Sequence, residues 1–508
     1  MRATPKFPDR RRQDGQTVLW FLATVAACCC VFALVYNVGQ VANHKEATIN
    51  AADAAALSGA MVEARMLNFQ AYTNRAMIAN EVTIAQLVSL DSWVQYDNNM
   101  MQWIARYTAL VPYLNSVTQT IANVSQQVAY GVDQMAHGLV PAVEAENTAL
   151  WSVGQYACLF AVTAANDVAS QIADANATTF GNPARYDEHP QLVAGAAAFV
   201  LNQFTWLKFT DYCGGDDRKN AKGVILNSRD PFSTHRGEGW LIKALNVGLE
   251  VVGLAATFGT AYTGLEKTSG TTTLQDYDHW AAQDSLDATV STLQFCGIIL
   301  PIPCGYKTRV IPFGPPIAYG RVDADSDGSV GGNLCNQNTT NCQLAIDNAV
   351  NPISWGGIPK FRDIAQDLSK NDPCSVKNGS DSPSLSYIAA VQKSGKATLT
   401  TQRIGIGTVD VSGPQGSPGS SRSNDQLQNG DNLTAISAAC TFFLRPDLNK
   451  DDKTQGLLAR QDGVHEYASL YNPYWQARLT KPDTTWTTLV YGFIGHPGLN
   501  LVLNPPIP

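Results

Sequence analysis

The chain has 508 residues, more than one compact core usually organises, and this length predicts two or three folding units. Charged residues make up only 15% of the sequence, against roughly 25% in ordinary soluble domains, which is typical of exported, membrane-linked proteins. The net charge of −8 leaves no basic face for a phosphate backbone and excludes a typical nucleic-acid-binding protein.

An uncharged apolar run follows a basic N-terminal tail. Residues 17–38 contain no charged side chain and, at about 1.5 Å per residue, are long enough to cross a bilayer as one helix. The positive-inside rule predicts a cytoplasmic tail over residues 1–16 and an extracytoplasmic remainder. The basic side chains of the tail are Arg2, Lys6, Arg10, Arg11 and Arg12. The sequence therefore predicts a single-pass membrane protein with its N-terminus in the cytoplasm.

Two other interpretations of the apolar run are less favoured. Residues 25–28 loosely match a lipoprotein cleavage box, but the apolar run continues to residue 38, where a mature lipoprotein would be polar. A cleaved secretory signal needs a shorter apolar region with a polar sequel. The triplet Cys28–Cys30 is then interpreted as small, weakly polar packing inside lipid.

Cysteines outside the span predict disulfides. Their number is even, and the expected compartment is oxidising. They are Cys158, Cys213, Cys296, Cys304, Cys335, Cys342, Cys374 and Cys440. Short spacings favour the pairs Cys296–Cys304 and Cys335–Cys342. Because no CxxC occurs, neither a zinc ribbon nor a thioredoxin-like site is supported.

Residues 39–180 are predicted to form a helical stalk and bundle. No proline occurs between Pro8 and Pro112, which favours one long helix that leaves the membrane and later folds back. After Pro112, apolar residues recur every three or four positions, which predicts an amphipathic helix that buries this stripe in a core. The stripe consists of Leu114, Val117, Ile121, Val124, Val128, Val132 and Met135. A further helical stretch is predicted over 142–176.

Residues 181–508 predict a mixed α+β extracytoplasmic region, so the fold class is α+β overall. Turn-forming and aromatic residues become common here. The apolar run 241–263 is interpreted as a buried soluble helix, because Lys243 and Glu250 make a second span costly. Strands are predicted over 295–313 and 396–413.

Two further segments of this region have a distinct composition. Residues 412–432 are polar and of low complexity, which predicts a mobile surface loop. The aromatic cluster at 470–475 is typical of a core or a docking surface.

Motifs for chemistry are sparse. The sequence has no P-loop, no Gly-x-Ser-x-Gly, no His-Glu-x-x-His and no Gly-x-Gly-x-x-Gly, and its histidines are scattered, so no enzyme activity, no small-molecule substrate and no cofactor are predicted. One stretch resembles half of a calcium loop: Asp323, Asp325 and Asp327 precede a glycine that permits a sharp turn. Leu334 stands where such a loop carries its bidentate Glu. The alternatives are a loose Ca²⁺ site and an acidic surface turn.

The N-terminal region resembles a known family. The pair Gly15–Gln16, the single span and the run Asn50–Leu57 (NAADAAAL) are similar to the N-terminal module of TadG-like proteins of the Tad (tight adherence, Flp-type) pilus system. The resemblance implies a protein of the bacterial inner membrane, with a domain in the periplasm or at the cell surface. Its implied partners are other pilus-assembly or minor-pilin subunits.

Two departures limit what the resemblance implies. Trp20 stands where prepilins of this class carry a Glu, so cleavage by a prepilin peptidase is not expected. The Asp-x-Ser-x-Ser metal motif that many TadG-like proteins carry is missing from the sequence, so their metal-dependent adhesion is not carried over.

Small residues line one face of the predicted stalk helix. Two rows with a spacing of four lie on adjacent ridges: Ala52, Ala56 and Ala60, and Ala51, Ala55 and Gly59. Small side chains let another helix approach closely, so this face is interpreted as an assembly surface, with Asp53 on the solvated side. The plainer alternative is that alanine simply favours helix.

Two classes of function stay open. The first is a membrane-anchored, minor-pilin-like structural or assembly component of a Tad/Flp-type pilus or adhesion system. The second is a membrane-tethered periplasmic binding protein or enzyme that uses the same anchor module.

Overall fold

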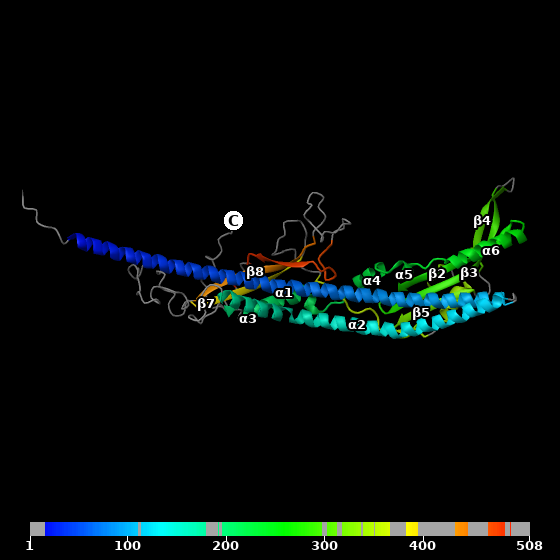
Figure 1. Cartoon of the computed structure of the whole chain (residues 1–508), viewed down its shortest axis with the longest axis horizontal. Helices are drawn as coiled ribbons and strands as arrows, with labels where there is room; N and C mark the ends of the chain where they lie inside the picture. The colour runs from blue at the N-terminus through cyan, green and yellow to red at the C-terminus, as the bar shows by residue number, and fades with distance from the viewer. Residues whose placement is uncertain are drawn as a thin grey trace, which may run out of the picture.

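The computed structural model describes residues 16–109, 113–178, 191–192, 196–296, 302–311, 317–336, 339–349, 351–365, 383–394, 432–445, 466–482 and 488. Over these residues the molecule is an elongated α+β rod built along one helix, which confirms the predicted fold class (Figure 1). The tail up to residue 15, the predicted strand at 396–413 and the predicted loop at 412–432 (except Asn432) lie outside the described residues.

The axis of the rod is α1 (Gln16–Thr108), whose 93 residues make it about 140 Å long. The chain turns at Tyr113, which has a positive φ of 69°, and returns antiparallel to α1 as α2 (Leu114–Thr178). The predicted fold-back is therefore present. One detail differs: α2 continues through Pro141, where the sequence had predicted a separate helix.

The face of α2 that packs on α1 is not the predicted one. The predicted core stripe lies outward, with Val117, Val124 and Val128 at least 50% exposed. The inner face of α2 instead carries Ala122, Ala129, Ala136 and Val140, all of which are buried. The prediction was wrong because it assumed that the larger apolar side chains face the core. Alanines let two helix axes approach more closely.

Sheet A packs on α1 nearer to the N-terminus than sheet B does. Its strands are β1 (Gln191–Leu192), β7 (Ser384–Ser394), β8 (Asn432–Phe443) and β9 (Trp475–Thr480), antiparallel in the order β1-β7-β8-β9. Alternate residues of β7 point to opposite faces: Tyr387 packs against α1, and Ile388 packs toward α3 (Ala196–Phe209). The sheet is thus held between two helical layers.

Sheet B lies against the distal half of α1. Its order is β2-β3-β5-β6, and β4 pairs with the second half of β3. The strands are β2 (Ala261–Leu274), β3 (His279–Cys296), β4 (Ile302–Val310), β5 (Ala318–Asp325) and β6 (Ile353–Ser354). Strand β5 approaches α1 so closely that a Cβ at Gly320 would lie 2.0 Å from the Ser92 carbonyl oxygen.

Short helices and a distal arm complete the rod. They are the 3₁₀ turn η1 (Asp211–Cys213) and helices α4 (Arg218–Asn227), α5 (Pro231–Thr234), α6 (Trp240–Ala256) and α7 (Thr340–Asp347). Figure 1 shows α6 and β4 projecting at the end opposite the N-terminus. The predicted strands near 295–313 are present as the end of β3 and β4.

The prediction of a buried helix at 241–263 was wrong. Helix α6 ends at Ala256, and Val247 and Val251 on its outer face are more than 60% exposed. Only one side of α6 packs on β2, where the Asn246 amide exchanges two hydrogen bonds with the backbone of Leu265. The apolar composition of this run therefore reflects its outer face as well as its packed one.

Candidate functional site: the anchor and the small-residue face of α1

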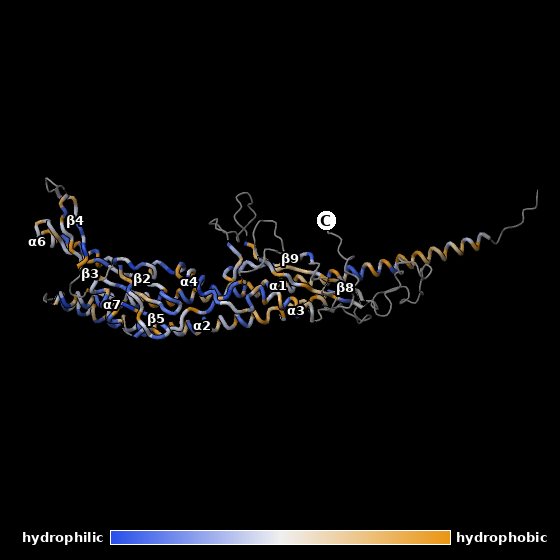
Figure 2. Tube along the Cα trace, turned by 180° about the vertical axis from the view of Figure 1, so that it is seen from behind, coloured by the Kyte–Doolittle hydropathy of each residue, from blue (hydrophilic) through white to orange (hydrophobic). Residues whose placement is uncertain are grey.

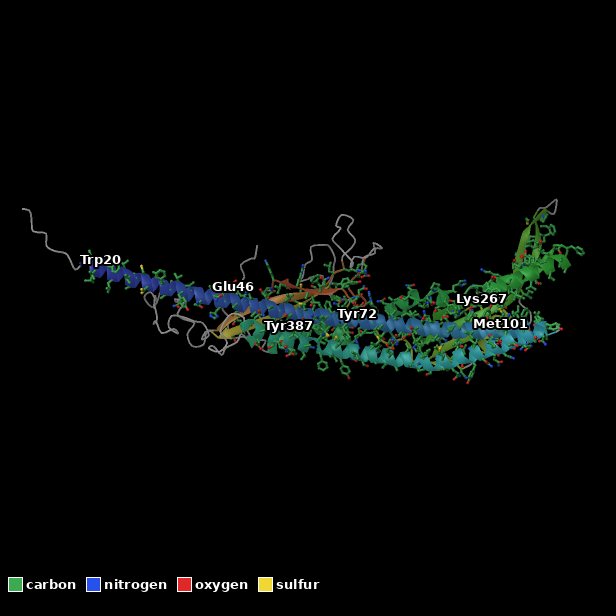
Figure 3. The ribbon with its side chains drawn as sticks, in the orientation of Figure 1. Trp20, Glu46, Tyr72, Met101, Lys267 and Tyr387 are labelled. Atoms are coloured by element: carbon green, nitrogen blue, oxygen red, sulfur yellow. A yellow bond between two sulfur atoms is a disulfide. The ribbon has the colours of Figure 1, made fainter. Side chains whose placement is uncertain are left out.

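The first turns of α1 project beyond the rest of the described chain. Figure 2 shows this end as predominantly hydrophobic, and Figure 3 places Trp20 on it, away from the sheets. Trp20 and Phe32 are more than 70% exposed, although both are large and apolar. Exposure of such residues along a whole segment is typical of a helix that lies in lipid.

Two helices of the described chain, α1 and α2, are long and apolar enough to cross a bilayer. The apolar run of α1 is entirely exposed in the folded chain, whereas 28% of the corresponding run in α2 is buried. The α1 run is therefore the better candidate for a membrane span, and α2 is a packed helix of the rod.

The small-residue face of α1 begins at Ala51, about a dozen residues after the apolar run ends at residue 38, and it is fully covered within the chain. Ala52, Ala56 and Ala60 are at most 1% exposed, as are Ala51 and Ala55. The covering residues are Ala165, Ala169 and Ala173 of α2 and Tyr387, Ala389, Val391, Ala435 and Ala439 of sheet A.

Polar contacts fix the same face to sheet A. Thr441 donates a hydrogen bond to the carbonyl oxygen of Ala60 at 2.9 Å, and Ser437 donates one to the Asp53 carboxylate. A Cβ added at Gly59 would lie 2.2 Å from the Tyr387 ring. Glycine is therefore required at this position for the ring to pack on the helix.

These contacts correct the interpretation of this face as an assembly surface. Close packing on the small residues is present, but its partners are α2 and sheet A of the same chain. Asp53 is not a free solvated charge, since Ser437 binds it. The sequence could show that a close partner was needed, but not that the chain itself supplies it.

Three buried acids follow one another along α1, and sequence reasoning missed them. Glu63, Glu81 and Asp91 are 0% exposed. Burial raises the pKa of Glu63 well above its usual value, and it raises the pKa of Glu81 to about 8. Burial, with the charge of Asp133 as a second cause, raises the pKa of Asp91 to about 7. Burial therefore shifts all three acids toward the protonated form.

The predicted calcium ligands take part in a different arrangement. Asp323 lies on β5, where Arg321 binds both of its carboxylate oxygens at 2.6 and 2.7 Å. His279 contacts Asp323 at 2.9 Å and also pairs with Asp325. Burial opposes ionisation of Asp323, but its hydrogen bonds to His279 and Arg321 hold its pKa below the usual value.

Asp325 and Asp327 also accept hydrogen bonds from within the turn. Asp325 accepts hydrogen bonds from the Ser329 hydroxyl and from the backbone N–H of Asp327, and the Asp327 carboxylate accepts one from the N–H of Ser329. Within the described ranges no group of three His, Cys, Asp or Glu side chains is arranged to hold a metal ion. Asp323, Asp325 and Asp327 therefore do not converge on one metal position in the folded chain. Ca²⁺ binding by the turn stays a prediction.

Disulfides occur in both halves of the rod. Cys335 pairs with Cys342, as the spacing predicted, and Cys158 of α2 pairs with Cys213. Cys304 and Cys440 are also disulfide-bonded. The side chain of Cys296 lies outside the described residues, so the pair Cys296–Cys304 stays a prediction.

A cavity of about 490 Å³ lies where α1 meets α4 and the segment 469–472. The two acids that line this cavity make hydrogen bonds that hold the fold together. Asp363 accepts a hydrogen bond from the backbone N–H of Leu470 at 2.7 Å, and Asp217 accepts one from the Tyr471 hydroxyl at 3.0 Å. Burial raises the pKa of Asp363 to about 6. These bonds join the segment 469–472 to the rod. Leu470 and Trp475 are core residues, which is the first of the two alternatives predicted for that aromatic cluster.

Comparison with known proteins agrees with the anchor geometry. No curated protein and no solved structure matches the chain. One family model matches residues 15–62, described as putative Flp pilus-assembly TadE/G-like. The matched segment spans the exposed anchor and ends just after the small-residue face. Residues 15–62 of this chain are thus similar to the putative TadE/G-like Flp pilus-assembly family.

Proposed function

We propose that this protein is a minor-pilin-like structural component of a Tad/Flp-type pilus or adhesion apparatus, held in the bacterial inner membrane by the first turns of α1. The observation that carries the proposal is the continuity of α1. One unbroken helix contains the family-matched anchor and the scaffold on which both sheets pack. Movement or assembly of the anchor would therefore carry the whole rod with it.

The charge on the two sides of the apolar run supports one orientation of the chain in the membrane. A basic tail precedes the apolar run, so the tail stays in the cytoplasm and the rod stands on the outer side of the membrane. The two disulfides at Cys158–Cys213 and Cys335–Cys342 fit an oxidising compartment on that side.

A topology experiment tests the orientation. An alkaline phosphatase fused after Gln70 is expected to be active, because that enzyme matures only outside the cytoplasm. A cytoplasmic reporter at the same position should be silent. The opposite pair of results would place the rod in the cytoplasm and refute the proposal.

A deletion experiment tests the role. Removing the chain from the bacterium that makes it should reduce the number of pili seen by electron microscopy and the attachment of cells to surfaces. The full chain should restore both, and a chain that lacks residues 17–38 should restore neither. Normal piliation after deletion would favour the alternative, a membrane-tethered periplasmic binding protein or enzyme.

A further inference from the structure

Large apolar side chains form a continuous stripe on the outer face of α2. Between Leu114 and Leu139 this outer α2 stripe has side chains that are 40–56% exposed. Its members are Leu114, Val117, Ile121, Val124, Val128, Met135 and Leu139. Figure 1 shows α2 along one edge of the rod, with α1 on its inner side. Soluble proteins rarely leave an apolar patch of this extent uncovered.

The spacing of the stripe is that of a coiled-coil seam. Steps of three and four alternate from Leu114 through Val117, Ile121 and Val124 to Val128, and they continue through Gly131, Met135 and Gly138. This alternation has a mean period of about 3.5 residues, which keeps the stripe facing one partner helix along its length. Scattered surface apolar residues would show no such period.

The two glycines of the seam have no role within the described chain. A Cβ added at Gly131 or at Gly138 would meet no atom within 4 Å among the described residues. Glycine inside a helix costs about 1 kcal/mol relative to alanine, so an exposed helix gains nothing from it. A close approach by a second helix from outside explains why both positions are small and why they recur one heptad apart.

The charges beside the seam permit a copy of the same helix. Between Leu114 and Leu139 the only charged residue types are Asp133 and His137, and they lie 3.4 Å apart in an i,i+4 pair. The flanking positions Thr120, Gln127 and Gln134 are polar and uncharged. Two identical seams would therefore meet without like-charge repulsion, and no charge pattern selects a different partner.

The membrane anchor sets the register. Two copies rooted in one bilayer by the same α1 residues hold their stripes at the same height and in the same direction. Confinement to a surface also raises the effective concentration of one stripe for the other. A parallel, in-register pair related by a two-fold axis normal to the membrane satisfies both conditions.

We propose that the outer α2 stripe is the seam through which copies of this chain associate side by side, in parallel and in register. Its parallel register rests on the membrane anchor of the proposed function. The contact itself does not depend on a role in the pilus. The contact residues are on α2, so the seam is separate from the family-matched segment of α1.

Cysteine crosslinking in membranes tests the seam. The full chain would carry Cys28, Cys29 and Cys30 as serines, because those thiols are free, and one new cysteine at Val117→Cys or Met135→Cys. Each variant is expected to form a disulfide-linked species of twice the chain mass under mild oxidation. The matched control Gln126→Cys is exposed on the same helix but off the stripe, and it should remain a monomer.

Each outcome decides the proposal. Crosslinks only between Val117→Cys and Met135→Cys, when the two variants are mixed, would show an antiparallel pair and overturn the register. A crosslink to a different protein would overturn the second copy as the partner. Equal crosslinking of Gln126→Cys, or none at all, would overturn the seam. Piliation of the strain is scored separately, so a failed role in the pilus remains distinguishable from a failed seam.

Substitution of the two glycines gives a second test, in which thermal stability should rise and the crosslinking rate should fall. The double variant Gly131→Ala, Gly138→Ala should raise the thermal stability of the detergent-purified monomer, since alanine favours helix. It should also slow the Val117→Cys crosslink about tenfold, because the added methyl groups hold the two helices apart. A gain in stability with unchanged crosslinking would show that the glycines do not lie at the contact and would overturn their assignment to the seam.

Discussion

Sheets A and B pack on the same helix through different chemistry. Sheet A meets α1 mainly through alanines and the Tyr387 ring, beside the hydrogen bonds from Ser437 and Thr441. Sheet B meets α1 through an apolar cluster that includes Trp280 and Val88, and also through a buried polar centre around Asp284. The first contact depends chiefly on the size of side chains, whereas the second also depends on the pairing of buried charges. The two halves of the rod should therefore respond to different kinds of substitution.

The polar centre of sheet B draws on separate parts of the chain. Asp284 of β3 is 0% exposed and lies 2.9 Å from Arg236 and 2.8 Å from Lys267. Ser92 of α1 donates a hydrogen bond to the same carboxylate at 2.9 Å. A neighbouring hydroxyl pair, Ser89 and Thr272, lies 2.7 Å apart. The carboxylate thus joins α1 to the sheet while it pairs with two buried basic side chains.

The largest expected effect is the loss of this carboxylate. Asp284→Ala should lower the free energy of unfolding by about 3–5 kcal/mol, because it leaves Arg236 and Lys267 buried without their anion. Urea denaturation followed by circular dichroism measures the change. The control Asp216→Ala removes an exposed pair with Arg218 and should cost less than about 1 kcal/mol. Equal losses for the two variants would contradict a buried charge centre.

The next effect compares the disulfides of the two halves. Cys158–Cys213 closes a separation of 55 residues and Cys335–Cys342 one of 7. Loop-closure entropy assigns about 4 kcal/mol to the first bond and about 2–3 kcal/mol to the second. Paired Cys→Ser variants, unfolded by heat, measure both. If both pairs shift one common transition, the halves unfold together; if each shifts its own, the rod has two cooperative units.

A buried acid beneath sheet B gives a pH-dependent effect. Glu81 keeps its proton in the folded chain, since burial raises its pKa to about 8, and it accepts a hydrogen bond from Asn147. The unfolded chain releases this proton above about pH 4.5, so folding stability falls as the pH rises from there toward 8. Glu81→Gln should remove about 3 kcal/mol of this fall between pH 5 and pH 8.

Denaturation at the two pH values checks this prediction, and the slope is the informative quantity. Near pH 5 the variant and the original chain should differ little, since both side chains are neutral. At pH 8 the variant should be the more stable. An unchanged slope would show that Glu81 is ionised in the folded chain and that water or another group solvates it.

Features of the rod that depend on local composition could be predicted from the sequence, whereas contacts between distant residues could not. The anchor, the long helix and its return were predictable because each rests on local composition: an uncharged run, no proline, and small residues in rows. The polar centre was not, because Ser92, Arg236 and Asp284 have no local pattern in common and meet only through the fold.

The faces of α2 and α6 were misassigned for one physical reason. Periodicity shows that an apolar face exists but not which partner covers it. In α2 the rod buries Ala122 and leaves Val124 outside, and in α6 it leaves Val251 outside. The acidic turn was misinterpreted for the same reason. Alternating aspartates indicate a cluster of oxygens but not what binds them. Arg321, which pairs with Asp323, lies two residues upstream and outside the motif.

The smallest expected effect tests the size dependence at sheet A. Ala56 is 0% exposed between α2 and sheet A, so a leucine there must displace packed neighbours. Overpacking of this kind costs about 1–3 kcal/mol, whereas helix propensity alone changes by a few tenths. Ala56→Leu should therefore lower the thermal midpoint and the amount of protein in membranes. That result reverses the expectation for a free assembly surface, on which added bulk would leave the fold intact.

The control Ala79→Leu adds the same side chain at an exposed position of α1 and should leave both quantities near their original values. If Ala56→Leu keeps its stability but loses a crosslink to another subunit, the small-residue face is an interface after all, and the internal packing of α2 and sheet A on it is not what the chain uses in the membrane.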